Sequence, residues 1–181
     1  MFVLEDSSSV HLGPQLRELT YAYRIKTAPD GRPFCLGPAL TRPSSVAAVL
    51  GRLLGHEAIE VCGVLCLTTR RRVICWHEVS RGSLDTTAVH PREIFKAAIV
   101  ANAAAIVLGH NHPSGDPEPS FADLAVTARL VAAGGLLGVS VLDHIILGHS
   151  TYVSLRASRL AVFASKARRN RRLSAVCTLR G

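Results

Sequence analysis

Residues 104–123, which read AAIVLGHNHPSGDPEPSFAD, are the most informative segment of the chain for its fold. Its first six residues are apolar or glycine, which is typical of a strand buried on both faces of a sheet. Residues 110–119 contain three prolines and a glycine and predict an irregular loop. Ser120 then predicts the N-cap of a helix that continues to about Ala133. A buried strand, a tight loop and a helix therefore follow one another directly.

This segment brings four polar side chains to one place. His110 and His112 are two residues apart at the end of the strand, so their rings lie on the same side. Ser120 and Asp123 are three apart and become neighbours on the first turn of the helix. Two imidazoles and a carboxylate are zinc ligands, and three protein ligands leave a fourth position for water. The spacing predicts a metal site on His110, His112 and Asp123, with Ser120 beside it.

Each half of this pattern also has a simpler interpretation. Ser120 and Asp123 resemble a capping box, in which both side chains only close the start of the helix. His110 and His112 alone could pack in the core or bridge loop carbonyls. We favour the metal site because both pairs occur together, directly after a buried strand. Capping is compatible with that role, since Ser120 can cap the helix and still face the site.

Outward from this segment, strand and helix patterns alternate along the chain. The apolar run at 60–67 is typical of a second buried strand, and a charged tip at 70–72 connects it to a partner strand. Proline favours the first position of a helix. Strands are predicted over 60–67, 73–79, 104–109, 138–147 and 151–155, and helices from Pro43, Pro91 and Ser120. The alternation predicts an α/β domain whose helices cover both faces of a mixed sheet.

The predicted domain occupies residues 45–156 and has a shorter segment on each side. Residues 1–44 are predicted to form a strand and loop extension, in which residues 18–26 have strand character. Residues 157–181 form a basic tail. The net charge of +8 belongs to this end, because residues 156–181 hold eight basic residues and no acidic one. Such a tail could contact nucleic-acid phosphates weakly or simply be solvated.

Nothing in the sequence predicts a membrane protein or an exported one. The first residues lack the basic and apolar regions of a signal peptide. The longest uncharged apolar stretches, 97–109 and 130–142, have 13 residues each, and a membrane span needs about 18. Five cysteines without C-x-x-C spacing do not favour a disulfide scaffold, and Cys62, Cys66 and Cys75 are better explained as reduced core residues than as metal ligands or nucleophiles. We therefore expect a cytoplasmic protein.

The segment from His110 to Asp123 resembles the JAMM (MPN-domain) metalloprotease family, and its HNHPSGDPEPS version is similar to the bacterial RadC-type branch. The resemblance extends to residues 79–85, 90–98 and 141–146 and covers roughly residues 45–156. It implies a three-layer α/β fold, MPN/JAMM in type and similar to that of cytidine deaminases. It also implies one zinc ion per chain and hydrolysis of an amide or isopeptide bond in a protein or peptide substrate.

That family also uses a glutamate at the head of an E-V-x-G-x-L pattern, which residues 60–65 match position by position. The placement of Glu60 is notable on physical grounds as well, because a carboxylate that heads an apolar strand is costly to bury without a function. Glu57, Glu78 and Glu93 are competing carboxylates. Glu57 lies before the apolar run and could be solvated, and Glu93 is expected on an exposed helix face.

The mechanism that follows is metal-assisted hydrolysis. Zinc on His110, His112 and Asp123 would activate a water molecule. Glu60 would take the proton of that water and pass it to the leaving amine. Ser120 would donate a hydrogen bond to the developing oxyanion or hold the water.

The remaining polar residues near these patterns have less definite roles. His144, beside Asp143, could orient a metal ligand or could be a satisfied core histidine. Asn111, between the two predicted ligands, could anchor the loop or contact substrate. The sequence identifies no partner for four other histidines, His56, His77, His90 and His149.

Three other functions compete with the hydrolase. A zinc deaminase would need H-x-E and P-C-x-x-C motifs, and the chain has neither. A nucleic-acid-binding protein associated with DNA repair, without protease activity, is suggested by the basic tail and by the RadC resemblance. RadC-type chains, however, commonly carry an N-terminal helix-hairpin-helix region, and residues 1–44 do not resemble one. A scaffold that has lost catalysis is disfavoured because every expected site position is filled.

Overall fold

The computed structural model describes residues 39–82, 89–158 and 163. The predicted strand at 18–26 and nearly all of the basic tail lie outside these residues. Within the described ranges, every helix is too short or too polar to span a bilayer. The elements in chain order are α1 (Pro43–Leu54), β1 (Val61–Leu67), β2 (Val73–Arg81), α2 (Pro91–Val100), β3 (Ala105–Asn111), α3 (Phe121–Leu137), β4 (Ser140–Leu147) and β5 (Tyr152–Ser154).

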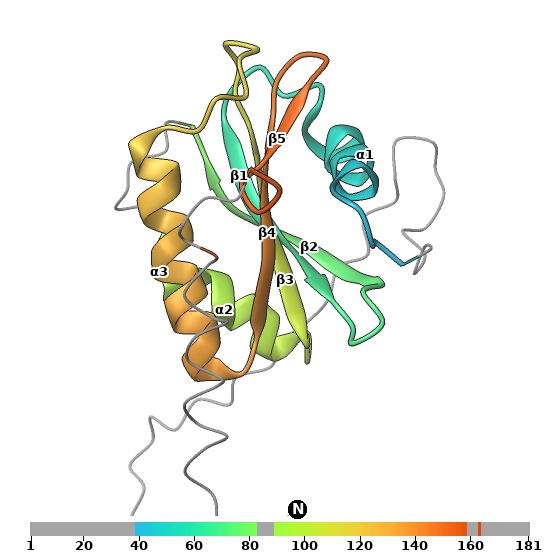
Figure 1. The fold of residues 1–181 in the computed structure, drawn as a ribbon, viewed down its shortest axis with the longest axis vertical. Helices are drawn as coiled ribbons and strands as arrows, with labels where there is room; N and C mark the ends of the chain where they lie inside the picture. The colour runs from blue at the N-terminus through green and yellow to red at the C-terminus, as the bar shows by residue number, and fades with distance from the viewer. Residues whose placement is uncertain (1–38, 83–88, 159–162, 164–181) are drawn as a thin grey trace, which may run out of the picture.

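The elements form three layers, as the sequence predicts. The five strands make one sheet in the order β2-β1-β3-β4-β5. Only β3 and β4 run parallel among the neighbouring pairs described, so the sheet is mixed. Helix α1 covers one face, and α2 and α3 cover the other (Figure 1). The predicted α/β class with helices on both faces is therefore confirmed, and the arrangement is consistent with an MPN/JAMM fold.

Two hydrophobic cores, one on each face, explain why the central strands are apolar throughout. Every residue of β1 and of β3 is buried. In β1, Cys62 and Val64 face α2 and α3, whereas Val61 and Leu65 face α1. This alternation confirms that the strands are buried on both faces and that Cys62 is a reduced core residue; burial raises the pKa of its thiol.

Glycine at position 109 allows α1 to pack tightly against β3. A Cβ atom at Gly109 would lie 2.5 Å from a methyl carbon of Leu50, which is too close for a real contact. Leu50 itself is fully buried. Gly109 directly precedes His110, so this tight packing lies beside the end of β3 that carries the histidines.

Several predicted boundaries differ from the observed ones. The predicted loop over 110–119 is wrong at its start, because β3 continues through Asn111. It continues since β3 has partners on both sides: His110 is in register with Cys62 of β1, and Asn111 with Leu147 of β4. Pairing ends at Pro113, which has no amide proton to donate.

Other boundaries also differ: β2 runs to Arg81 rather than to Val79, and β4 starts at Ser140 rather than at residue 138. Strand β1 starts at Val61, so Glu60 immediately precedes the strand. Helix α3 runs to Leu137 rather than to about Ala133. Gly134 is a packing residue rather than a helix end, because a Cβ atom there would lie 2.4 Å from the carbonyl oxygen of Val139. The helix ends at Gly138, whose φ of 73° is the left-handed conformation that glycine adopts without strain.

Candidate metal centre

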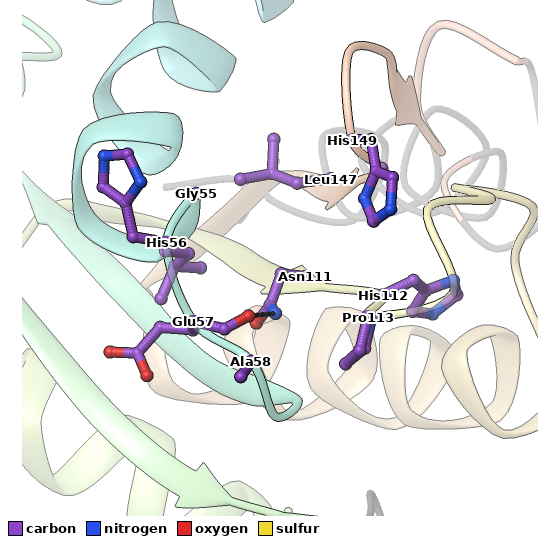
Figure 2. A pocket seen from close by; sticks show the side chains of 11 residues that line it. Gly55, His56, Glu57, Ala58, Asn111, His112, Pro113, Leu147 and His149 are labelled. Atoms are coloured by element: carbon purple, nitrogen blue, oxygen red, sulfur yellow. Dashed lines mark hydrogen bonds between the residues drawn. The ribbon is translucent and has the colours of Figure 1, made fainter.

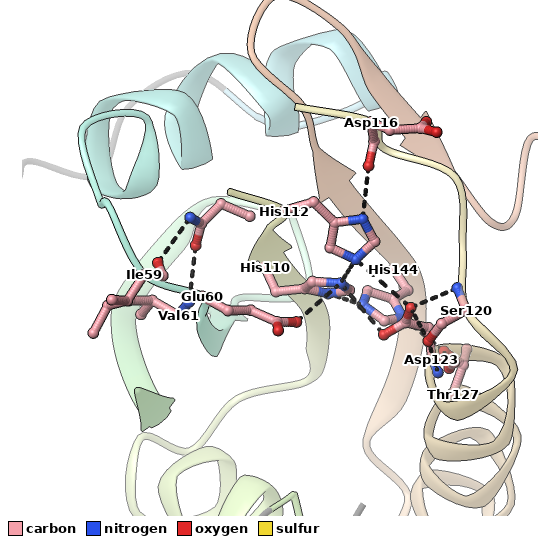
Figure 3. Close-up of polar contacts among 11 residues, drawn as sticks. Ile59, Glu60, Val61, His110, His112, Asp116, Ser120, Asp123, Thr127 and His144 are labelled. Atoms are coloured by element: carbon pink, nitrogen blue, oxygen red, sulfur yellow. Dashed lines mark hydrogen bonds and ion pairs between the residues drawn. The ribbon is translucent and has the colours of Figure 1, made fainter. Parts of the chain in front are cut away.

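The start of β1, the end of β3 and the start of α3 meet at one end of the inner strands and bring the predicted site residues together (Figure 3). Strands β1 and β3 are antiparallel, so the start of β1 lies beside the end of β3. Glu60 just before β1 therefore approaches the histidines of β3. The first turn of α3 completes the group with Ser120 and Asp123. The structure thus brings together all five residues that the sequence selects.

The Nε2 atom of His110 lies at the centre of this group. His110 is fully buried on the side of the sheet that α3 covers. Its Nε2 atom lies 2.9 Å from Nε2 of His112, 3.3 Å from Oδ1 of Asp123 and 3.9 Å from Oε1 of Glu60. His112 is partly exposed, with Nε2 3.8 Å from Oδ2 of Asp123. Two imidazoles and two carboxylates therefore converge on one small volume.

Ser120 and Asp123 also form the capping box that the sequence suggests. The backbone N–H of Asp123 donates to Oγ of Ser120 at 3.2 Å, and the backbone N–H of Ser120 donates to Oδ2 of Asp123 at 2.8 Å. The Ser120 hydroxyl donates its proton to the same Oδ2 at 2.6 Å. These bonds hold one carboxylate oxygen of Asp123, and Oδ1 faces His110. The predicted oxyanion contact of Ser120 stays a prediction, since its proton is directed at Asp123 here.

Glu60 approaches the site from the opposite side to Asp123. Its side chain is 21% exposed, whereas that of Asp123 is 3% exposed. Ligand atoms of Glu60, His110 and His112 all lie within 4.8 Å of one another, close enough for one ion. The geometry therefore offers two ways to complete a set with the histidines, through Asp123 as the sequence predicts or through Glu60.

The three competing carboxylates are engaged elsewhere. Glu57 and Glu78 both accept hydrogen bonds from the guanidinium of Arg81, at 2.6 Å and 2.9 Å for the shorter contacts. Glu93 pairs with Lys96 on the exposed side of α2. Glu60 is therefore the glutamate that the fold brings to the histidines, as predicted.

Each histidine of the pair has an outer partner on its Nδ1 atom. Nδ1 of His110 lies 2.8 Å from Nε2 of His144, and Nδ1 of His144 lies 2.6 Å from Oγ1 of Thr127. Nδ1 of His112 lies 2.8 Å from the carbonyl oxygen of Asp116. Burial lowers the pKa of His110 to about 4, against the opposing effect of Asp123. Burial also holds the pKa of His144 well below its usual value. The rings of His110 and His144 are therefore neutral near pH 7. Neutral imidazole is the form that binds a metal ion.

These contacts show that the residues fit a cation. A carbonyl oxygen only accepts, so Nδ1 of His112 donates to it, and Nε2 is the ring nitrogen whose lone pair an ion could use. That lone pair faces Nε2 of His110 at 2.9 Å, with carboxylate oxygens nearby. Imidazole nitrogens and carboxylate oxygens are the donors that zinc and related divalent ions bind. The site is suited to a divalent ion on the basis of its donor set.

The side chain of Asn111 holds the chain around Glu60 in place. Its Oδ1 accepts the backbone N–H of Val61 at 2.9 Å, and its Nδ2 donates to the carbonyls of Ile59 at 3.0 Å and Glu57 at 3.3 Å. Asn111 is buried. The sequence suggests that it anchors a loop or contacts substrate, and the structure shows it anchoring residues 57–61, which we call the Glu60 segment.

A cavity of about 330 Å³ opens beside His112, on the α1 side (Figure 2). Its wall includes Asn111 and two further histidines, His56 after α1 and His149 after β4. The sequence gives no partner for these two histidines, because α1 and the β4–β5 turn meet only in the folded chain. Thr127 could have been found, since it follows Asp123 by four residues and therefore lies on the same helix face. His90, also without a predicted partner, caps α2 by accepting the N–H of Arg92.

Comparison with known proteins places this site in a recognised family. Residues 40–160 match the RadC-like JAB domain. A UPF0758 protein of Xanthomonas campestris pv. campestris is 47% identical over 119 residues, which are 66% of this chain and 53% of that protein. A UPF0758 protein of Alkaliphilus oremlandii is 44% identical over 118 residues, 65% of this chain and 51% of that protein. The chain spans about half the length of the curated relatives it matches.

Proposed function

Because this chain belongs to the RadC-like JAB domain family, we propose that it is a metal-dependent hydrolase that cleaves an amide bond in a peptide or isopeptide substrate. The observation that supports this most directly is that ligand atoms of Glu60, His110 and His112 lie within 4.8 Å of one another, with His112 also lining a cavity. Glu60 and His112 are both partly exposed, so solvent can reach the group, which a purely structural cluster would not need.

In this proposal His110, His112 and Asp123 hold the ion, which we take to be zinc. Zinc suits two imidazoles and a carboxylate and leaves a position for water. When bound, such an ion supplies Lewis acidity and lowers the pKa of a water molecule toward neutrality. Asp123 is the preferred third ligand because Ser120 and the helix start already orient its carboxylate, whereas Glu60 is less buried.

Glu60 then acts as the general base. It lies across the site from Asp123 and is in part exposed, so a water molecule can reach its carboxylate. Glu60 accepts a proton from the attacking water as the new carbon–oxygen bond forms. The same proton passes to the amide nitrogen as the carbon–nitrogen bond breaks, which regenerates the carboxylate.

Ser120 has two roles in this scheme: it orients Asp123 and it donates a hydrogen bond to the oxyanion. In the free protein its hydroxyl orients Asp123 by donating to Oδ2. We propose that the hydroxyl turns toward substrate when the oxyanion develops, because a single donor at that position commonly contributes about 10²–10³ in rate. The backbone N–H of Ser120 keeps its own bond to Oδ2 and holds Asp123 meanwhile.

The decisive experiment compares zinc-loaded wild-type protein with Glu60→Gln on peptide and isopeptide libraries, with cleavage read by mass spectrometry. We expect Glu60→Gln to keep the metal and to lose about 10²–10⁴ in turnover, the usual contribution of a general base. Glu93→Gln is the matched control, because Glu93 lies on the exposed side of α2. Equal cleavage by wild type and Glu60→Gln would contradict the role of Glu60.

The same libraries address the alternative of a nucleic-acid-binding protein without hydrolase activity. That alternative depends on residues 157–181, nearly all of which lie outside the described residues. If no library member is cleaved and deletion of residues 157–181 abolishes DNA binding while metal binding persists, the alternative replaces the hydrolase.

A further inference from the structure

We propose that Cys66 and Cys75 form an oxidation site, a pair of facing thiols that a peroxide converts reversibly into a disulfide between β1 and β2. Both cysteines are reduced in this structure, as the sequence predicts. Neither thiol belongs to the metal centre or takes part in the proposed hydrolysis.

The two cysteines face each other across neighbouring antiparallel strands. Cys66 of β1 is in register with Cys75 of β2, and Leu65 faces Trp76 in the same register, which shifts only beyond Cys66. Directly opposite residues of an antiparallel pair have Cα atoms about 4.5–5.5 Å apart, and a disulfide spans about 4.4–6.8 Å between Cα atoms. The backbone pairing therefore gives a separation that a disulfide can bridge.

Both side chains lie on the same face of the sheet, the one that α2 and α3 cover. Cys66 is fully buried in the core on that face, and Cys75 packs against the same core from β2. Their neighbours Leu65 and Trp76 belong to the core on the opposite face, as strand alternation requires. The two thiols are joined by a hydrogen bond, so the sulfur atoms are already in contact.

The pair is asymmetric in a way that suits oxidation. Cys75 is partly exposed on β2, which forms one edge of the sheet, whereas Cys66 is buried on an inner strand. The hydrogen bond from the Cys66 thiol lowers the pKa of Cys75 to about 7, with burial opposing it. The same bond and burial raise the pKa of Cys66. Peroxides react with thiolates, so Cys75 is the thiol that reacts first and Cys66 is the one that resolves it.

The oxidation takes two balanced steps. The Cys75 thiolate attacks one oxygen of hydrogen peroxide: a sulfur–oxygen bond forms, the oxygen–oxygen bond breaks, and the released hydroxide takes a proton from solvent. The Cys66 sulfur then attacks the Cys75 sulfur, and the sulfenic hydroxyl leaves as water with the Cys66 proton. In total the two thiols lose two electrons and two protons, and the peroxide is reduced to two water molecules.

Cys62 provides an internal contrast on the same strand and the same face. It is buried like Cys66, but its partner in register is Ser80, and burial raises the pKa of its thiol. A cysteine in a core often serves only as a small apolar side chain, and Cys62 fits that description. The feature that distinguishes Cys66 is the second thiol opposite it.

The experiment treats the folded whole chain with stoichiometric hydrogen peroxide at pH 7, blocks the remaining thiols and maps tryptic peptides by mass spectrometry. Trypsin releases Cys66 in residues 53–70 and Cys75 in residues 73–81. We expect these two peptides to be joined with the loss of two hydrogen atoms, and dithiothreitol to separate them. Because residues 53–70 also contain Cys62, Cys62→Ala is the matched control, and its yield of linked peptide should equal that of wild type.

A second variant tests the order of the two steps. Cys66→Ser keeps a hydrogen-bond donor beside Cys75 but removes the resolving sulfur. The linked peptide should be lost, and the sulfenic acid of Cys75 should accumulate and be trapped by dimedone. In concentrated urea the cross-links of the wild-type chain should spread over other pairs of its five cysteines, because the strands no longer hold these two together.

Three results would overturn the oxidation site. Cys75 could be oxidised, or stay unreacted, without the linked peptide; Cys62→Ala could lose the linkage; or the same linkage could form in equal yield in urea. Failure of Cys66→Ser to fold would leave the wild-type map, the urea comparison and Cys62→Ala to decide. These results do not depend on metal binding or on cleavage of any substrate, so the oxidation site and the proposed hydrolase stand or fail separately.

Discussion

His110 and Glu60 approach the same point from two differently built parts of the molecule. His110 is fully buried and linked through side chains to β4 and α3, by way of His144 and Thr127. Glu60 is partly exposed and lies in the Glu60 segment, which Asn111 holds by backbone contacts. One part is fixed by side chains in the core, and the other is held by its main chain at the surface.

This difference matches the different demands on a ligand and on a base. Metal ligands must keep their geometry while substrate binds and leaves, and buried hydrogen-bonded side chains do so. A general base must meet both the water and the leaving nitrogen, so it needs solvent access and some freedom of movement. If the proposed function is right, we expect α3, β3 and β4 to determine the affinity for the ion and the residue before β1 to determine turnover.

The most direct test of this division between ligand and base is to neutralise the carboxylates of Asp123 and Glu60 in turn. Asp123→Asn should lower Zn²⁺ affinity by more than the roughly 10–100-fold that an outer partner contributes. Glu60→Gln should change affinity by only a few-fold. Both substitutions preserve size, and asparagine can still accept the Ser120 N–H bond. Chelator competition measures both.

The reverse result would identify the other ligand set. If Glu60→Gln lost Zn²⁺ and Asp123→Asn kept it, Glu60 would be the third ligand, as the group of Glu60, His110 and His112 also permits. Asp123 would then serve mainly to cap α3.

The ligand side of the site is far easier to predict from sequence than the base side. His110, His112, Ser120 and Asp123 follow from strand alternation and helical spacing within one continuous segment. The Asn111 contact to Val61 joins residues 50 positions apart, and only the antiparallel pairing of β1 with β3 creates it. Local periodicity contains no information about such a pairing. Glu60 is found from sequence mainly through the family pattern, and the one physical sign beside it is the cost of burying a carboxylate at the head of an apolar strand.

The next prediction tests whether Asn111 positions the base. Asn111→Ala removes three hydrogen bonds to the Glu60 segment. We expect turnover to fall by about tenfold, since displacement of a catalytic group by about 1 Å can cost as much as 100-fold. Zn²⁺ affinity should stay within a few-fold of wild type, because the Asn111 side chain lies on the other face of β3 from the ring of His110. Steady-state kinetics and chelator competition on the same preparation measure the two effects.

A stability measurement provides the control for Asn111→Ala. The variant leaves buried backbone groups without partners, which should lower the free energy of unfolding by about 1–3 kcal/mol. Turnover is therefore compared well below the melting temperature. A loss of Zn²⁺ affinity as large as the loss of turnover would show that Asn111 supports the ligands as much as the base.

The smallest effect is expected at Arg81, which holds the Glu60 segment from outside by pairing with Glu57. This pair is exposed, so Arg81→Gln should change turnover by less than about threefold, because surface ion pairs contribute little.

The Arg81 hydrogen bond lowers the pKa of Glu57, with burial opposing it. A carboxylate whose pKa is lower in the folded state stabilises the fold above the pKa of the unfolded chain, about 4.3, and loses that contribution as pH falls. The melting-temperature difference between wild type and Arg81→Gln should therefore be small at pH 7 and should shrink further below about pH 4. A tenfold loss of turnover in Arg81→Gln would instead show that the Glu60 segment is positioned from its exposed side, and the distinction between a buried Asn111 anchor and a dispensable surface pair would fail.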